Sequence, residues 1–313
     1  MNVWFRVLTV TLTNKTSRLV FGGNDETTDY NYDIAVTGSK YLSSLKDECT
    51  ISINNLSYET LTRIIDEKIY SVEVNCGYKE GSTMTIFKGE VLWITDSLNS
   101  DRTHTCKILC ASALVAKYGQ ARMSLSLQGG LNLYTILTYA SKVNGIKNAR
   151  ISEKLKATIL QEPTSTNETF SAWLNRLSDE NEYLMINSNG TNGATFSIYD
   201  ARYERGTRKR LSKDFINLDG GYPKLTKQGL TFSMMPMIEL QCGDIIQLDK
   251  DIIDISISSK DEISENRGYY LDKEGRYLLF SYSYQLENHG DSFSLSLNCK
   301  SYSLISNYLN IKE

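Results

Sequence analysis

His104 and Cys106 are the two residues whose types and spacing come closest to a catalytic pair. They lie two positions apart in the sequence Thr-His-Thr-Cys, and a strand here would place both side chains on one face. An imidazole beside a thiol can generate a nucleophile when a third group orients the ring. The sequence offers no evident orienting carboxylate, so we expect a half-buried strand residue beside a core thiol and predict no catalytic residue.

The segment from Asp244 to Asp254 is dense in carboxylates, the groups that bind calcium or perform acid-base chemistry. Asp249 and Asp251 have an Asp-x-Asp spacing, but the glycine and the terminal glutamate of an EF-hand are missing. The cysteine spacings fit no common zinc pattern, and the chain has only 2 histidines. We therefore predict a strand followed by a solvated loop here, with no metal site and no cofactor.

Composition argues against several classes of function. The chain has 313 residues with 34 Lys and Arg against 37 Asp and Glu, and this balance gives no electrostatic basis for dedicated nucleic-acid binding. The basic run from Arg202 to Lys213 is diluted by acidic residues, which fits a solvated linker or a protein contact better than a phosphate site. The 20 tyrosines suit carbohydrate or protein surfaces, and equally the cores of strands.

Cysteine usage and apolar run lengths bear on the compartment in which the protein is made. The 6 cysteines are scattered through a chain too long to need a disulfide framework, so we expect free thiols in the core of a protein made in a reducing cytoplasm. The longest apolar runs, such as residues 91–94, are far shorter than the ~20 residues of a membrane helix. The first residues show no secretion-signal pattern. We expect no membrane insertion.

The length favours two or three domains, and the first, residues 1–112, has the pattern of antiparallel β structure. Residues 50–53 and 72–76 alternate apolar and polar side chains, which is typical of half-buried strands. A longer strand over residues 84–94 contains Gly89. A glycine inside a strand often marks a bulge or a close approach of another backbone.

The middle region, residues 113–213, predicts a small α+β domain that ends in the basic linker. A helix over residues 131–143 is followed by Gly145 as its stop signal. A second helix begins near Phe170, behind the capping candidates Thr166, Asn167 and Thr169. A hairpin with a loose tip follows it over residues 183–199.

The third region, residues 214–313, returns to β structure. Residues 293–299 form the cleanest alternating strand of the chain, and it pairs with residues 277–284 across a turn at 288–291. The tail over residues 302–311 is apolar enough to dock on another element. Both β regions close with a long β-turn-β unit whose second strand ends in Cys-x-Ser, which suggests an internal duplication.

Several short motifs lie along the chain in a characteristic order. They comprise residues 47–56, 72–78, 86–91 and 101–103, then 131–145 and 168–177, then 221–224, 229–232, 236, 243–248 and 275–277. This order and spacing resemble the bacteriophage tail baseplate hub proteins, a family related to the N-terminal half of type VI secretion spike proteins. The motif positions with structural roles are Gly77, Tyr78, Phe87, Gly89, Pro236, Gly243 and Asp244.

The resemblance implies a mainly β fold, α+β overall, in which two antiparallel tube-type β-barrel domains are related by pseudo-duplication. Residues 1–112 and 214–313 would be these domains, and residues 113–213 the inserted α+β domain. Such a hub is a homotrimer that adapts a hexameric tail tube to a threefold spike or tip. It also meets baseplate wedge proteins and a tape-measure protein, and DNA passes through its channel without specific binding. The implied location is the virion tail, after synthesis in the host bacterial cytoplasm, and the implied role is assembly, not catalysis.

Three further expectations complete the sequence-based interpretation. Asp249, Asp251 and Asp254 would face the channel and keep DNA from adhering. No lytic or needle domain would be fused after the last hairpin. The alternatives are a Tyr-rich β protein that binds receptors or carbohydrate, and a hydrolase that uses carboxylates of the middle domain.

Overall fold

The computed structural model describes most of the chain. The described residues are 6–23, 32–42, 47–66, 71–79, 81, 83–98, 103–112, 122–146, 148–162, 164–181, 183–187, 196–204, 206–216, 221–226, 229–254 and 275–301. The expected tail over residues 302–311 and the tip of the middle hairpin lie outside them.

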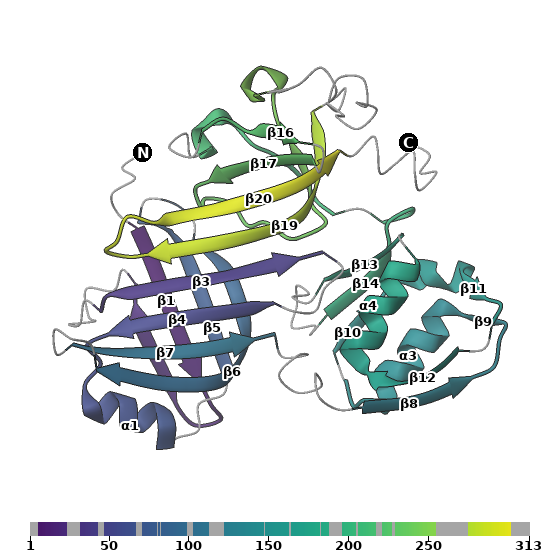
Figure 1. The fold of residues 1–313 in the computed structure, drawn as a ribbon, viewed down its shortest axis with the longest axis horizontal. Helices are drawn as coiled ribbons and strands as arrows, with labels where there is room; N and C mark the ends of the chain where they lie inside the picture. Colours follow the sequence, from purple (N-terminus) through teal and green to yellow (C-terminus); the bar gives the residue numbers. More distant parts are fainter. Residues whose placement is uncertain are drawn as a thin grey trace.

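One large sheet of thirteen strands dominates the molecule (Figure 1). Its main path runs β16-β17-β20-β19-β3-β4-β7-β6-β5-β1-β2, with β15 and β18 joined at the side of β19. The strands are β1 (Arg6–Thr13), β2 (Arg18–Gly22), β3 (Ile34–Tyr41), β4 (Glu48–Asn54), β5 (Ser71–Tyr78), β6 (Met84–Leu98), β7 (His104–Ala111), β15 (Arg208–Arg210), β16 (Lys224–Thr226), β17 (Gly229–Met234), β18 (Ile245–Gln247), β19 (Arg276–Glu287) and β20 (Phe293–Ser301). The mainly antiparallel β prediction is confirmed.

The first and third regions meet inside this sheet. Strand β19 pairs antiparallel with β3, and in that ladder Leu286 lies opposite Val36 with both side chains fully buried. A single hydrophobic cluster contains residues of both regions. Among the described strands the path from β16 to β2 is open and does not close into a barrel. The two β regions therefore share one sheet and one core.

Alternating burial explains why these segments are strands. In β20 the side chains of Phe293, Leu295, Leu297 and Cys299 are buried, while the residues between them face outward. A Cβ atom at Gly89 of β6 would collide with the carbonyl oxygen of Ala111, so only glycine lets the two strands approach this closely. The close approach predicted for Gly89 is confirmed.

The first region also holds a helix that the strand pattern did not predict. Helix α1 (Tyr58–Asp66) follows β4, and the Ser57 hydroxyl accepts a hydrogen bond from the Thr60 amide at 3.1 Å. Only Ile64 of this helix is fully buried. A nine-residue helix with one buried side chain leaves a weak periodic signal beside the strand patterns around it.

The middle region builds a second, separate core (Figure 1). Helices α3 (Leu133–Val143) and α4 (Phe170–Glu180) pack with a three-stranded sheet ordered β10-β14-β13. Thr169 caps α4 by accepting from the Ala172 amide, and Gly145 has φ of 69° just after α3. Both predicted helices and the predicted hairpin are confirmed.

The remaining elements of the middle region are short. They are β8 (Arg122–Leu127), β9 (Leu131–Asn132), β10 (Ala149–Ile151), η1 (Glu153–Ala157), β11 (Ile159–Leu160), β12 (Thr164–Thr169), β13 (Leu184–Asn187) and β14 (Phe196–Asp200). Strand β12 pairs with β8, and β11 pairs with β9.

The basic segment after the middle region differs from the solvated linker that the sequence predicts. Its residues Arg208–Arg210 form β15, which pairs parallel with β18 of the large sheet. At its start, the Arg202 guanidinium binds the fully buried Asp200 carboxylate and lies 3.8 Å from the ring centre of Tyr183. The 3-10 turns η3 (Lys213–Phe215) and η5 (Lys250–Ile252) follow β15 and β18. The segment is ordered because the backbone pairing and the buried Asp200 hold it.

Candidate functional site

The structure gives His104 a carboxylate partner that the sequence did not reveal. The Nδ1 atom of His104 lies 2.9 Å from an oxygen of Asp96, which is on the neighbouring strand β6. Asp96 is also the direct cross-strand neighbour of Cys106. Burial, and the nearby Asp96 charge, raise the pKa of the Cys106 thiol to about 11. A thiol whose pKa is raised carries little thiolate near neutral pH and is a poor nucleophile.

Tyr78, one of the family-motif positions of the first region, lies in the seam between the two β regions. Tyr78 is buried, and its ring packs edge-on against Phe293 of β20 with ring centres 5.5 Å apart. Arg6 of β1 lies over the same Phe293 ring at 5.4 Å and donates to the Glu287 carbonyl at 3.3 Å. Gly77 and Phe87 are buried in β5 and β6. These contacts join the first region to the last hairpin.

The motif positions of the third region are built around the buried carboxylate of Asp244. Its two oxygens accept hydrogen bonds from the amides of Thr207 and Gln241, each at 2.9 Å. Burial raises the pKa of Asp244, and the two amides oppose that effect. Gly243 beside it has φ of 97°, and Pro236 is buried. Asp244 therefore ties the chain that leaves the middle region to the turn that enters β18.

Asp249, Asp251 and Asp254 are exposed around the 3-10 turn that follows β18. The Arg210 guanidinium lies 3.3 Å from a carboxylate oxygen of Asp249. Within the described part of the chain, no group of three or more His, Cys, Asp or Glu side chains could hold a metal ion. Which way these three carboxylates face in an assembly stays a prediction.

The outward face of the large sheet is the most distinctive surface of the molecule. The strand registers align its side chains in rows that cross several strands. One row consists of Ser233, Ser296, Ser283, Ser39 and Glu48. The next consists of Ser294, Gln285, Thr37, Thr50, Leu109 and Trp93. Hydroxyl and amide groups therefore cover the sheet, with apolar side chains gathered at the β6 end.

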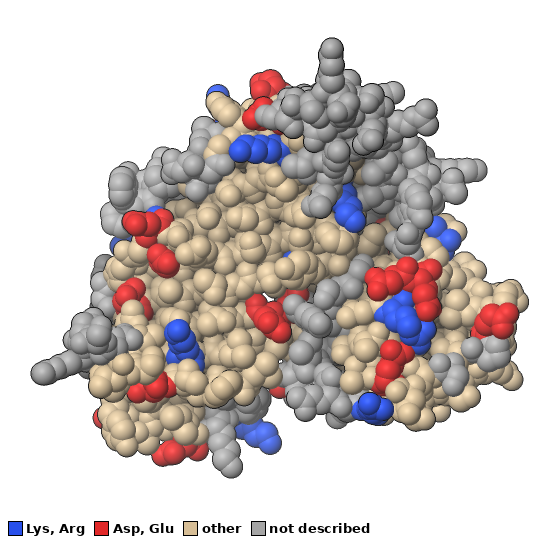
Figure 2. All heavy atoms as spheres, in the orientation of Figure 1, with Lys and Arg blue, Asp and Glu red and all other residues tan. Residues whose placement is uncertain are grey.

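Figure 2 shows this face as a broad area with few charged side chains over β20, β19, β3, β4 and β7. Two large apolar residues at its β6 end are exposed, since Trp93 is 66% and Leu109 is 36% accessible. Trp93 stands directly opposite Leu109, next to a β-bulge that shifts the register of β6. An open face with hydroxyl groups and exposed aromatic side chains fits contact with another molecule better than chemistry.

The described part of the chain contains no helix that is long and apolar enough to cross a membrane. All six cysteines are free and buried, which confirms the prediction of core thiols.

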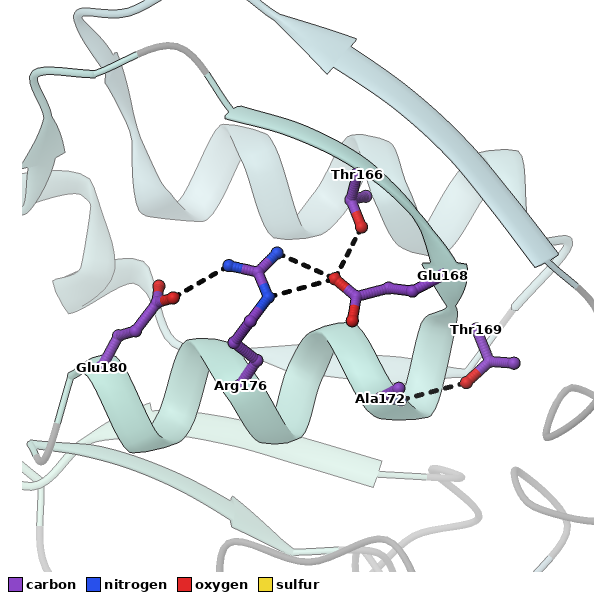
Figure 3. A network of polar contacts seen from close by, with 6 residues as sticks. All are labelled: Thr166, Glu168, Thr169, Ala172, Arg176 and Glu180. Carbon is purple, nitrogen blue, oxygen red and sulfur yellow. Dashed lines mark hydrogen bonds and ion pairs between the residues drawn. The ribbon is translucent and has the colours of Figure 1, made fainter.

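A polar network links helix α4 to strand β12 in the middle region (Figure 3). Arg176 of α4 donates to Glu168 of β12 through Nε at 3.1 Å and Nη2 at 2.8 Å, and to Glu180 through Nη1 at 2.9 Å. Thr166 donates to the same Glu168 oxygen at 2.6 Å. Partial burial disfavours the Glu168 carboxylate, but the hydrogen bonds and the Arg176 charge together lower its pKa. The network fastens α4 to β12.

Comparison with known proteins places this architecture among phage tail and secretion proteins. No family model matches the chain, and no curated protein matches it. A 43 kDa tail protein of prophage MuSo2 from Shewanella oneidensis has a TM-score of 0.56 at 9% identity, covering 94% of this chain and 96% of that one. A tail protein from Neisseria meningitidis has a TM-score of 0.55 at 9% identity, covering 96% and 97%.

The c3393 protein of E. coli has a TM-score of 0.55 at 12% identity, covering 88% of this chain and 76% of that one. That protein is a component of the type VI secretion system with structural similarity to the T4 tail proteins gp27 and gp5. The structural neighbours thus belong to the group that the sequence motifs resemble. At these identities the likeness establishes a shared fold.

Proposed function

We propose that this chain is a structural hub of a phage-type tail. The observation that carries the proposal is the fold shared with the tail proteins from Shewanella oneidensis and Neisseria meningitidis. Each of these two alignments covers at least 94% of this chain and at least 96% of the other protein. Three copies would form a ring in which each contributes two β regions of tube type, related by duplication. Such a ring offers pseudo-sixfold symmetry to a hexameric tail tube and threefold symmetry to a spike or tip.

The open edge of β2, at one end of the large sheet, supports the assembly of several copies into a ring. In the described part of the chain the main path ends at β2 on one side and at β16 on the other. The outer edge of β2 pairs with no described strand, and such an edge invites pairing with another chain. The outer edge of β16 is partly occupied, because the Leu225 amide donates to the Asp254 carbonyl and the Asp254 amide donates to the Pro223 carbonyl. A head-to-tail contact between two different edges closes into a ring when the rotation fits.

The proposal assigns partners and a location as well. The tail tube protein would bind above the ring, the spike or tip protein below it, and wedge and tape-measure proteins around them. Asp249, Asp251 and Asp254 would line the channel, where their charge repels the phosphates of passing DNA. An assembled ring with these residues on its outer wall would contradict that assignment. The protein would act in the virion tail after synthesis in the host cytoplasm.

A substitution at Val20 of β2 tests whether the outer edge of this strand pairs with another copy of the chain. Gly23 donates to the Leu8 carbonyl, and Asn14 to the Ser17 carbonyl. The alternation of an antiparallel ladder then points the Val20 amide away from β1, toward the open edge. A Val20→Pro variant removes this outward donor and keeps the pairing with β1, because proline is tolerated at edge strands.

We expect the wild-type chain to be a trimer in size-exclusion chromatography with light scattering, and Val20→Pro to be a monomer with a similar melting temperature. Val20→Ala is the matched control, and it should stay trimeric because its amide is kept. A wild-type chain that is monomeric at every concentration, alone and with tail tube protein, would contradict the hub. A trimeric Val20→Pro variant would contradict the role of β2 only.

A further inference from the structure

A shallow groove of about 380 Å³ lies on the outward face of the large sheet, near the β16 end. Its floor consists of backbone and short polar side chains of β17, β20 and β19. The strand registers align one complete row across it. This row consists of Lys224, Thr231, Asn298, Ser281 and Tyr41. The groove is therefore built by cross-strand neighbours from five strands, and it lies on the face of the sheet and not at its edge.

Two exposed tyrosines flank the groove from opposite sides. Tyr41 ends β3 and is 44% accessible, and Tyr222 precedes β16 and is 57% accessible. Four strand spacings separate β3 from β16, which is roughly 19 Å. A tyrosine offers a flat apolar ring and a hydroxyl group. Each ring can therefore stack on a ligand while its hydroxyl stays hydrogen-bonded to water. The spacing suits an elongated ligand and not a single small ring.

The floor between the tyrosines supplies many hydrogen-bonding groups and little charge. Ser233 and Ser296 lie side by side with their hydroxyls 3.4 Å apart, and Asn298, Thr231, Ser281 and Ser283 surround them. Hydroxyl groups both donate and accept hydrogen bonds, whereas the side-chain oxygen of Asn298 is buried. Among the described residues that line the groove, Lys224 at the rim is the single charged one.

We propose that this groove binds an extended oligosaccharide. Sugar rings present apolar C–H faces that stack on tyrosine, and hydroxyl edges that pair with serine and threonine. One lysine gives too little positive charge for a nucleic acid, whose binding rests on several phosphate contacts. An added peptide strand needs a free sheet edge, and the backbone groups of β17, β20 and β19 are already paired with one another.

The proposed site rests on the groove of the single chain and not on the hub proposal. A glycan array and isothermal titration calorimetry test it with the purified full-length chain. The probes are an N-acetylglucosamine tetramer, maltotetraose, and an oligosaccharide that carries a carboxylate. Binding of the carboxylated chain alone would assign the ligand end to Lys224, and Lys224→Gln should then weaken it.

Tyr41→Ala and Tyr222→Ala are the decisive variants. Each should weaken the association constant about tenfold, which corresponds to about 1.4 kcal/mol. Tyr139→Ala and Tyr203→Ala are matched controls, since those side chains are 49% and 59% accessible and do not line the groove. Unchanged affinity in the controls and loss in both groove variants would support the site. The absence of any bound glycan on the array, or equal loss in all four variants, would overturn it.

Discussion

Tyr284 of β19 lies directly over Gly38 of β3, so closely that a Cβ atom at position 38 would overlap its hydroxyl group. The same Cβ atom would also stand 2.6 Å from the carbonyl oxygen of Glu48. The two residues belong to different β regions and are direct neighbours in the ladder that joins them. This contact leaves no room for a side chain at position 38 in the seam between the two regions.

A methyl group at position 38 should therefore loosen the seam. We expect Gly38→Ala to lower the free energy of unfolding by about 1–3 kcal/mol, the usual cost of overpacking a filled core. Urea denaturation followed by circular dichroism measures the change. Ser39→Ala is the matched control, because the neighbouring side chain points to solvent and its loss should change little. An unchanged unfolding midpoint for Gly38→Ala would contradict the close contact.

Local patterns in the sequence predict most elements but not the way they join. The alternation of Phe293 to Cys299 and the helix that starts at Phe170 depend on neighbours within a few residues, and both are observed. The pairing of β3 with β19 depends on a register between segments about 240 residues apart, which no local pattern contains.

The same limit applies to the candidate sites. Asp96 is close to His104 only because β6 and β7 pair in one register. The sequence shows Tyr41 and Tyr222 as two of 20 tyrosines, and only the row across five strands places both beside one groove. Functional residues of a sheet face come from separate strands, so the sequence gives their types and the fold gives their arrangement.

The six buried cysteines should stay reduced and react slowly in the folded protein. Cys49 lies directly opposite Cys110, but the Ser112 amide donates to the Asp47 carbonyl at 2.9 Å, which makes 49–110 a hydrogen-bonded pair. In such pairs the Cα atoms are about 5.5 Å apart. The Cβ atoms are then farther apart than the roughly 3.8 Å that a disulfide requires.

Burial also raises the pKa of Cys49 and Cys76 to about 12, so little thiolate is available near neutral pH. We expect Ellman's reagent to label the native protein slowly and all 6 thiols rapidly in guanidinium chloride. Cys106 should react first in the native state, because burial raises its pKa less, to about 11. Rapid labelling of several thiols in the folded protein would contradict this packing.

Removal of the Asp244 carboxylate should destabilise the junction between the middle region and the large sheet. Asp244→Ala leaves the amides of Thr207 and Gln241 without their acceptor, and each buried donor left unpaired costs about 1–3 kcal/mol. We expect a loss of at least about 2 kcal/mol, measured by denaturant unfolding. Asp251→Ala is the control, because that carboxylate is exposed and should change stability by about 0.5 kcal/mol or less. Equal effects of the two variants would contradict the anchoring role of Asp244.

The Glu168 network predicts a pH dependence of stability. The folded chain lowers the pKa of Glu168 below its usual value of 4.5, so the carboxylate contributes stability above that value. This contribution disappears as the pH falls through the lowered pKa, because the protonated acid binds Arg176 weakly. Arg176 is 45% and Glu168 is 30% exposed, so solvent screening holds the gain below about 1 kcal/mol.

The Glu168→Gln variant should therefore be less stable than the wild type at pH 7, and the difference should shrink as the pH falls below 4.5. Thermal melts at a series of pH values measure it. Asp179→Asn on the same helix is the control, since its side chain is exposed and lies outside the network. High salt should reduce the Glu168→Gln difference at pH 7, because screening weakens the attraction to Arg176. A difference that stays constant from neutral to acid pH would mean that packing, and not the charge of Glu168, fastens α4 to β12.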